Sequence, residues 1–289
     1  MKPWLRTAVG LAATGALAAG GLTAYGFGIE RSWLDVTRPS FLIPDLPIEF
    51  DGFRLAQLND FHVGPTVSPN AAVRQAIATC NLQQPDAVVL TGDYASSRSG
   101  LATFESLLNN LETRPVYAVL GNHDYRFGPR HRQAIVNALQ SRGMSVLDNR
   151  SEAITRHGRS LWLIGVGDGY SSHDRLDEAT RTLNESDHPR ILLTHYPDLL
   201  LQPLTTRIDL ALAGHSHGAQ IRLPFVTRRA LRKSDTRFVS GIYRVRNIQL
   251  YVNRGLGTSG VPIRIRSRPE VALITLRSPE VDVVARGRR

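Results

Sequence analysis

Five short apolar runs in this chain are each followed directly by residues that can bind metal ions. Residues 53–58 lead into Asn59-Asp60-Phe61-His62, and residues 87–90 lead into Thr91-Gly92-Asp93. Residues 116–120, 191–193 and 210–213 lead into Gly121-Asn122-His123-Asp124, Thr194-His195 and Gly214-His215-Ser216-His217-Gly218. Buried strands have this apolar pattern, and side chains at their carboxyl ends can converge at one edge of a sheet. The sequence therefore predicts one α/β sheet edge that carries a layer of Asp, His and Asn side chains.

Seven of these side chains are candidate metal ligands: Asp60, His62, Asp93, Asn122, His195, His215 and His217. If the segment after the first run is extended, Asp60 and His62 point to the same side and can hold one metal. Asp93, after a tight glycine turn, could bridge two cations. No ligand is a thiolate, so the set suits two divalent ions chosen from Mn²⁺, Fe, Zn²⁺ and Mg²⁺.

Such a pair of cations predicts hydrolysis of a phosphate ester. Two cations about 3.5–4 Å apart can hold a bridging hydroxide and clamp two phosphoryl oxygens. His123 is not needed as a ligand and lies beside Asn122. We expect it to stabilise developing charge or to protonate the leaving oxygen.

Taken singly, several of these motifs also fit ordinary structural roles. An Asp-x-His pair is often a capped turn, Gly-Asp is a common turn dipeptide, and His195 alone could be a core histidine. The two longer motifs are more specific. All five in this order, each after an apolar run, favour a metal site over five unrelated turns.

Composition limits the partners without identifying them. The single cysteine, Cys80, excludes an internal disulfide and is expected to be a small core residue. The formal net charge of +10 favours anionic partners such as phosphorylated substrates, phospholipid headgroups or nucleic acid. Arginine-rich composition from a GC-rich genome explains the charge equally well. We expect a phosphorylated small-molecule or lipid substrate and no specific nucleic acid, and the sequence indicates no oligomeric state.

The amino terminus predicts a membrane anchor. Residues Ala8 to Phe27 carry no charge and follow Lys2 and Arg6, a pattern typical of one membrane-spanning helix. A cleavable signal peptide ending near Ala16-Leu17-Ala18 is the alternative. The anchor would place the protein at the bacterial inner membrane, in contact with the membrane surface, with the catalytic domain outside the cytoplasm.

The remaining pattern predicts an α/β fold with two packed mixed sheets and helices outside them. Residues 1–30 would form the anchor, 31–49 a tether and edge strand, 50–280 one domain, and 281–289 a basic tail. We expect helices over residues 68–81, with Ser68-Pro69 at its start, 101–112, 130–142 and 175–184, and strands over 160–165, 220–223, 241–245, 248–252 and 271–276.

In residues 50–277 these motifs resemble the calcineurin-like metallophosphoesterase superfamily. The resemblance implies a four-layer α/β/β/α sandwich with a dinuclear site. It implies that one metal is bound by Asp60, His62, Asp93 and His217, and the other by Asp93, Asn122, His195 and His215, with His123 catalytic.

A narrower resemblance is to a membrane-tethered bacterial phosphodiesterase branch. It is carried by residues 25–30, by Asn253 to Gly260, and by Arg264 and Arg268-Pro269-Glu270. That branch includes hydrolases of UDP-2,3-diacylglucosamine in lipid A synthesis and enzymes of the cell wall. Protein phosphatases of the superfamily have a further Asp and Arg-Gly after Gly-Asp, whereas Tyr94 follows Asp93 here, so phosphoprotein substrates become doubtful.

Two arginine groups are candidates for substrate contact. Arg254 and Arg264 flank a glycine-rich loop and could clamp a phosphate, and the arginine-dense segment 222–246 could lie beside the site. A solvated surface loop is the alternative for that segment. The predicted function is hydrolysis of a phosphodiester or pyrophosphate bond, of a glycolipid precursor or of another envelope phosphodiester. A non-catalytic protein that binds anionic lipid is the alternative from another class.

Overall fold

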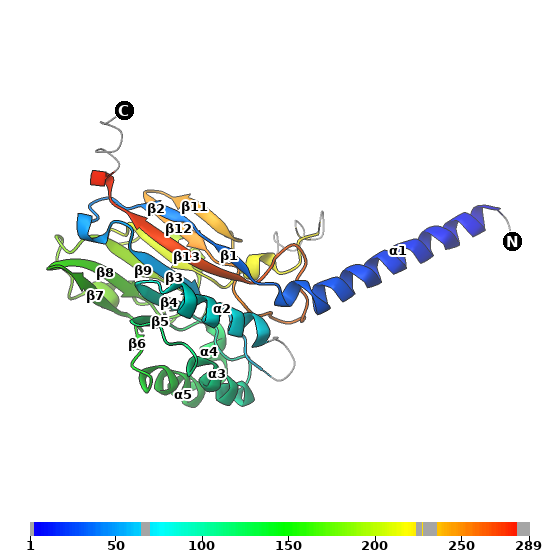
Figure 1. Ribbon diagram of the computed structural model, residues 1–289, viewed down its shortest axis with the longest axis horizontal. Coiled ribbons are helices and arrows are strands. Elements are labelled where there is room, and N and C mark those ends of the chain that lie inside the picture. Colours follow the sequence, from blue (N-terminus) through cyan, green and yellow to red (C-terminus); the bar gives the residue numbers. More distant parts are fainter. Residues whose placement is uncertain (1–2, 65–69, 224–226, 228–235, 282–289) are drawn as a thin grey trace.

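Two mixed β-sheets pack face to face at the centre of the protein (Figure 1). The structure is a computed structural model that describes residues 3–64, 70–223, 227 and 236–281. The first sheet has the order β1 (Asp35–Thr37), β13 (Glu270–Arg277), β3 (Arg54–Leu58), β4 (Ala87–Thr91), β5 (Val116–Val119) and β6 (Ser145–Val146), with β2 (Ser40–Leu42) also paired to β13. The second has the order β11 (Gly241–Val245), β12 (Ile248–Val252), β10 (Leu210–Ala213), β9 (Arg190–Leu193), β8 (Arg159–Gly165) and β7 (Arg150–Arg156).

In each sheet a run of four neighbouring strands is parallel. In the first sheet β3, β4, β5 and β6 run the same way, with Leu55 opposite Ala87 and Val88 opposite Val116. In the second sheet β8, β9, β10 and β12 are parallel. Their carboxyl ends therefore lie along one edge of each sheet, which is where the predicted ligands follow.

The core consists of apolar layers on the two faces of the strands. Val89 of β4 faces the second sheet and packs in a cluster with Ile191 and Leu212. Its neighbours Val88 and Leu90 point the other way, toward the helices. Because successive strand residues alternate between faces, a run with no polar residue is buried on both sides.

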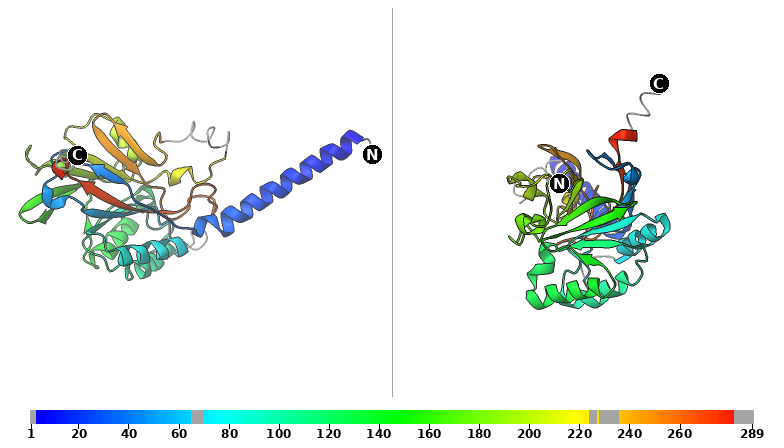
Figure 2. Two further views of the ribbon diagram at one scale, coloured as in Figure 1. Left: turned by 45° about the horizontal axis from the view of Figure 1, so that its top comes forward. Right: turned by 90° about the vertical axis from the view of Figure 1, so that its left-hand side faces the viewer.

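Helices cover the outer faces of the sheets (Figure 2). Side chains of α2 (Asn70–Gln83), α3 (Leu101–Leu108) and α5 (Pro129–Gln140) pack on the first sheet. Of the helices in the described residues, the short α6 (Leu176–Thr180) and the 3₁₀ helix η4 (Pro197–Leu201) pack on the second. The other short helices are α4 (Asn122–Arg126), η1 (Glu30–Ser32), η2 (Ile48–Phe50), η3 (Arg98–Gly100) and η5 (His217–Ala219).

Most elements expected from the sequence are present, with shifted ends. The expected start of the first helix at Ser68-Pro69 lies outside the described residues. The strand expected over 220–223 is wrong, since Ile221 forms only an isolated bridge with Ile265. The segment 31–49, expected to be a tether with an edge strand, supplies both β1 and β2, which pair with β13.

The amino-terminal helix α1 (Pro3–Gly28) projects away from the sheets (Figure 1). Within the described part of the chain, no helix combines the length and the apolar character needed to cross a membrane. The uncharged stretch consists largely of alanine and glycine, whose small side chains offer little apolar surface to lipid. The α/β class with two mixed sheets is thus confirmed. The transmembrane anchor is wrong, and so is the location at the bacterial inner membrane that depended on it.

Candidate metal centre

The predicted ligands lie at the carboxyl ends of five strands from both sheets. Asp60 and His62 follow β3, Asp93 follows β4, and Asn122 begins α4 after β5. His195 follows β9 of the second sheet, and His215 and His217 follow β10. The two parallel edges therefore face each other across one site.

Asp60, His62 and His217 form one group of possible ligands. The Oδ1 atom of Asp60 lies 3.4 Å from Nε2 of His217 and 3.6 Å from Nε2 of His62. The two histidine Nε2 atoms are 2.9 Å apart. All three residues are buried, and they can offer one oxygen and two nitrogen atoms to a common cation.

Asp93 joins this group to a second one. Its Oδ2 atom is 3.4 Å from Nε2 of His62 and 3.3 Å from Nε2 of His195. The Nδ1 atom of His215 lies 3.3 Å from Nε2 of His195 and 3.2 Å from Oδ1 of Asn122. The structure thus brings all seven predicted ligands into one continuous cluster.

The unpaired polar atoms of this cluster fit divalent metal ions. The Oδ1 atom of Asp60 is buried and accepts no hydrogen bond from any described residue. A buried carboxylate oxygen without a donor is unfavourable unless a cation compensates it. Oxygen and imidazole ligands within 4.8 Å of one another meet that need.

The protonation states of Asp60, Asp93, His215 and His217 also suit metal binding. Burial alone would raise the pKa of Asp60 and of Asp93, but the neighbouring histidines outweigh it and hold both values well below the usual range. Burial lowers the pKa of His217 to about 3 and, together with His195, the pKa of His215 to about 4. At neutral pH both imidazoles are therefore neutral and have a lone pair to offer.

Backbone conformation, not an extended strand, brings Asp60 and His62 together. Their φ angles are 51° and 47°, in the left-handed region that side-chain-bearing residues rarely adopt. Asp93, His215 and His217 also have positive φ, at 59°, 73° and 51°. The expectation of an extended Asp-x-His segment is therefore wrong, although the two side chains do converge. Such strain is typical of functional sites.

Two glycines allow the loops to approach this closely. A Cβ atom at Gly121 would lie 2.3 Å from Oδ1 of Asp93. One at Gly214 would lie 2.8 Å from Oδ2 of Asp60 and still closer to Asn59. Any other residue at these positions would displace the carboxylates.

Several supporting residues were not predicted from the sequence. The Nδ1 atom of His62 lies 2.9 Å from Oγ of Ser96, and that of His195 lies 2.8 Å from the carbonyl of Thr91. These contacts orient each ring so that Nε2 faces the cluster. Asp124 accepts hydrogen bonds from the amides of Asp93, Tyr94 and Gly121, and so ties the second and third loops together.

His123 lies at the edge of the cluster. Its ring centroid is 4.6 Å from that of His62, and its backbone amide donates to Oδ1 of Asp93 at 2.8 Å. Burial lowers the pKa of His123, with the Asp93 carboxylate opposing that shift. The ring is partly exposed, so a bound substrate can reach it.

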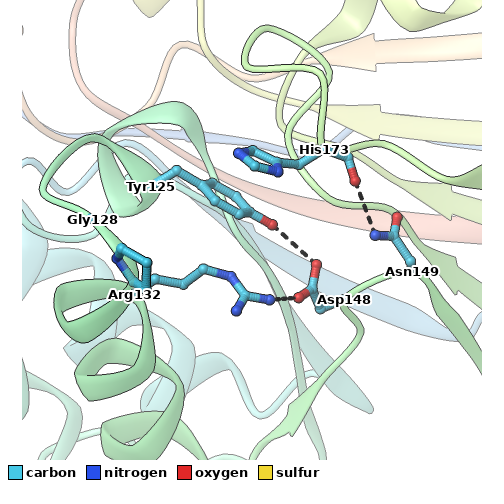
Figure 3. A pocket seen from close by; sticks show the side chains of 7 residues that line it. Tyr125, Gly128, Arg132, Asp148, Asn149 and His173 are labelled. Atoms are coloured by element: carbon cyan, nitrogen blue, oxygen red, sulfur yellow. Dashed lines mark hydrogen bonds and ion pairs between the residues drawn. The ribbon is translucent and has the colours of Figure 1, made fainter.

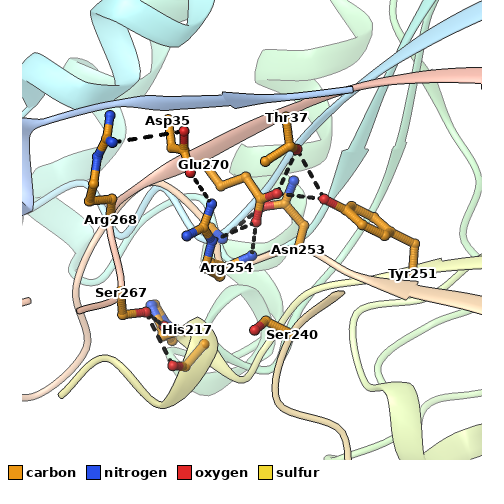
Figure 4. Close-up of polar contacts among 12 residues, drawn as sticks. Asp35, Thr37, His217, Ser240, Tyr251, Asn253, Arg254, Ser267, Arg268 and Glu270 are labelled. Carbon is orange, nitrogen blue, oxygen red and sulfur yellow. Dashed lines mark hydrogen bonds and ion pairs between the residues drawn. The ribbon is translucent and has the colours of Figure 1, made fainter. Parts of the chain in front are cut away.

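The two arginines predicted as phosphate clamps have internal partners. The guanidinium of Arg264 is fully buried and donates only to backbone carbonyls, among them that of His217. Arg254 forms ion pairs with Glu270 at 2.9 Å and Asp35 at 2.7 Å (Figure 4). These contacts favour a structural role for both side chains over direct binding of phosphate.

A cavity of about 390 Å³ beside α4 is lined by polar groups that pair with one another (Figure 3). Asp148 accepts a hydrogen bond from Tyr125 at 3.0 Å and forms an ion pair with Arg132. The amide of Asn149 donates to the carbonyl of His173 at 2.9 Å. Because these groups satisfy one another, the cavity offers no unpaired charge to a phosphate.

Sequence comparison links this cluster to known phosphoesterases. A profile described as calcineurin-like phosphoesterase matches residues 53–219, which contain every predicted ligand. Phosphodiesterase YaeI of Escherichia coli is 32% identical over 88% of this chain and 94% of its own. The uncharacterized metallophosphoesterase YkuE of Bacillus subtilis is 27% identical over 96% and 97%. A solved dimetal phosphatase from Danio rerio aligns with 71% of this chain and 88% of its own, at 12% identity and a TM-score of 0.46.

Proposed function

Because the chain belongs to the calcineurin-like phosphoesterase family, we propose that it hydrolyses phosphodiester or pyrophosphate bonds at the cluster around Asp93. Membership makes the protein a phosphoesterase, and its site is one for two divalent metal ions. The observation that carries the proposal is the continuous set of buried carboxylate and imidazole atoms contributed by both sheets.

The ligand assignment is part of the proposal. Asp60, His62, Asp93 and His217 would hold one ion, and Asp93, Asn122, His195 and His215 the other. When bound, the two ions supply Lewis acidity and lower the pKa of water at the site. The chain supplies the rest: carboxylates that balance the charge, and rings held in one orientation by Ser96 and the Thr91 carbonyl.

His123 is the residue we assign to the leaving group. Its lowered pKa keeps the imidazole neutral at pH 7, so an N–H can donate to the oxygen on which charge develops. The hydrogen bond from the backbone amide of His123 to Asp93 keeps the ring beside the cluster. Tyr94, the residue after Asp93, does not face the leaving group in the same way. It is buried, and its hydroxyl donates to the carbonyls of Leu90 and Val119.

Hydrolysis of bis-p-nitrophenyl phosphate with added Mn²⁺ tests the proposal. We expect His123→Ala to lower kcat by roughly 10²- to 10⁴-fold while about two metal ions per chain remain bound. His157→Ala, at an exposed hairpin turn, is the matched control and should keep the wild-type kcat and metal content. Wild-type turnover in His123→Ala would remove this residue from the mechanism.

The substrate panel separates the narrower alternatives. A diesterase should prefer bis-p-nitrophenyl phosphate to p-nitrophenyl phosphate, as the name of the Escherichia coli relative suggests. UDP-2,3-diacylglucosamine, the glycolipid precursor suggested by the sequence resemblance, belongs in the same panel beside other envelope phosphodiesters. A metal-loaded protein inactive on every ester would favour the non-catalytic alternative.

A further inference from the structure

Two arginines that form no ion pair with a described residue line a cavity close to the segment that carries His217. The cavity has a volume of about 610 Å³, and its walls include Arg222, Arg266, Ser240 and Tyr243. That volume lies within the range of small-molecule sites. It is larger than a single ion requires.

Neither guanidinium is neutralised by a described residue. Arg222 is partly buried and donates through Nε to the carbonyl of Gly218 at 2.7 Å and through one terminal nitrogen to Ser240. Three of its five N–H groups have no partner among the described residues. Arg266 is exposed and makes no hydrogen bond or ion pair with the described residues. Its φ of 54° holds it in the rarely populated left-handed region.

The nearby arginines behave differently. Arg254 is paired with Glu270 and Asp35, and Arg268 lies 3.9 Å from Asp35 and over the ring of Trp33 (Figure 4). Among the described residues, carboxylates therefore pair with these two arginines and none pairs with Arg222 or Arg266. Burial lowers the pKa of Arg222, which is the cost of an unpaired cation in this position.

The same backbone carries the cavity and a predicted ligand. The Gly218 carbonyl that accepts from Arg222 follows His217 directly. Ser267, which adjoins Arg266, donates to the carbonyls of His217 and Gly218 at 2.9 and 3.1 Å (Figure 4). The guanidinium of Arg222 and the backbone next to Arg266 are thus tied to the segment that carries His217.

We propose that Arg222 and Arg266 form an anion subsite for a second phosphate group of the substrate. This inference rests on the proposed function, because the scissile phosphodiester would occupy the metal centre. Guanidinium forks bind phosphate oxygens in pairs, and the adjacent hydroxyls of Ser240 and Tyr243 add polar contacts. The substrate class is therefore a phosphodiester that carries a further phosphate.

Direct binding tests the subsite without hydrolysis. Inorganic phosphate is titrated calorimetrically into protein freed of metal by chelation. The double variant Arg222→Gln/Arg266→Gln should bind phosphate at least tenfold more weakly than wild type, and Arg266→Lys should retain part of the affinity. Arg159→Gln, an exposed arginine at the β7–β8 turn, removes the same charge elsewhere and should bind like wild type. Equal affinity in the double variant and wild type would overturn the proposal.

Kinetics with metal-loaded protein tests the link to the substrate. Thymidylyl-thymidine is compared with its 5′-phosphorylated form, and the ratio of the two kcat/KM values measures the preference. We expect Arg266→Gln, whose exposed side chain is not needed for folding, to reduce this ratio at least tenfold. An unchanged ratio contradicts the subsite. If wild type hydrolyses neither compound and not bis-p-nitrophenyl phosphate either, the proposed function fails, and the phosphate titration still decides the subsite on its own.

Discussion

At the scale of single residues, the site depends on side chains placed by unusual backbone geometry. Five of the seven predicted ligands have positive φ, and Gly121 and Gly214 leave room for the carboxylates of Asp93 and Asp60. These features cost conformational energy in the absence of any ligand. A bound cation can compensate that cost, because it neutralises the carboxylates that the loops bring together.

Asp93→Asn is expected to lower metal content. Asp93 is the one ligand whose carboxylate oxygen lies within 3.4 Å of histidines in both groups, so the substitution removes a charge that both ions would share. Metal analysis after gel filtration should give clearly fewer than two ions per chain. Asp177→Asn, an exposed change on α6, is the control. A fully loaded Asp93→Asn protein would contradict the bridging role.

Cys80 is expected to be unreactive in the folded protein. Burial against the first sheet raises the pKa of its thiol from 9.0 to about 12. A thiol reagent at pH 8 should therefore label the native chain very slowly and react with one thiol per chain in denaturant. Rapid labelling of native protein would show that α2 opens easily.

The same pKa shift makes stability depend on alkaline pH. The unfolded thiol loses its proton near pH 9, whereas the folded one keeps it to about 12. The contribution to the free energy of unfolding is complete below pH 9 and declines as the pH rises toward 12. Cys80→Ala should lack this part of the decline.

At the scale of elements, the end of α1 and the turn η1 that follows it are connected to the metal centre. The carboxylate of Glu30 accepts a hydrogen bond from the amide of Ser267 at 2.6 Å. The hydroxyl of Ser267 in turn donates to the carbonyl of His217. In α1 itself, the carbonyl of Gly26 accepts a hydrogen bond from the amide of Arg264. The amino-terminal helix thus supports the loop that positions a predicted ligand.

Ser267→Ala should therefore weaken binding of one metal ion. The substitution removes the bonds to the His217 and Gly218 carbonyls and leaves the ligand side chains in place. We expect a calorimetric Mn²⁺ titration to show roughly tenfold weaker binding at one of two sites, as for other residues that orient ligands. Ser186→Ala, at an exposed turn, should titrate like wild type. Equal weakening at both sites would indicate general loosening of the fold instead.

Strongly periodic elements could be predicted from the sequence, and weakly patterned ones could not. The apolar runs of β3, β4, β5, β9 and β10 are buried on both faces, which made them unambiguous. β1 and β2 are three residues each and flank Pro39, and the sequence predicts only a tether with one edge strand there. β7 is polar along most of its length and was missed. Its position is fixed by pairing with β8, which no local pattern reveals.

The convergence of the predicted ligands could be expected because each follows such a run, but the residues that support them could not. Ser96 and Asp124 act through hydrogen bonds that depend on how separate loops meet. Tertiary contacts also explain why an arginine that the sequence suggests as a substrate ligand does not face a substrate. Arg264 looked like a phosphate ligand in sequence, and tertiary contacts use its N–H groups inside the protein.

At the scale of the whole molecule, the site connects the two sheets. Asp60, Asp93 and Asn122 follow strands of the first sheet, and His195, His215 and His217 follow strands of the second. Ions bound between them would link the layers in the folded state alone. Folding and metal binding should therefore be coupled.

Chelation of the metal should lower Tm. Free metal at 100 times Kd stabilises the folded state by about 2.7 kcal/mol per site, and that contribution disappears in excess chelator. Thermal unfolding followed by circular dichroism measures the shift, which should be smaller in Asp93→Asn. Leu161→Ala, in the layer between the sheets, should cost about 2–5 kcal/mol with or without metal. Identical Tm values with and without chelator would rule out the coupling.

The position of β13 has a consequence for synthesis of the protein. This strand, residues 270–277, lies between β1 and β3, which precede it by more than two hundred positions in the chain. A nascent polypeptide that still lacks it has β1 and β2 without a partner strand and an exposed edge on β3. That sheet can close only after residues 270–277 have left the ribosome, so chaperones have a long interval in which to bind the unfinished chain.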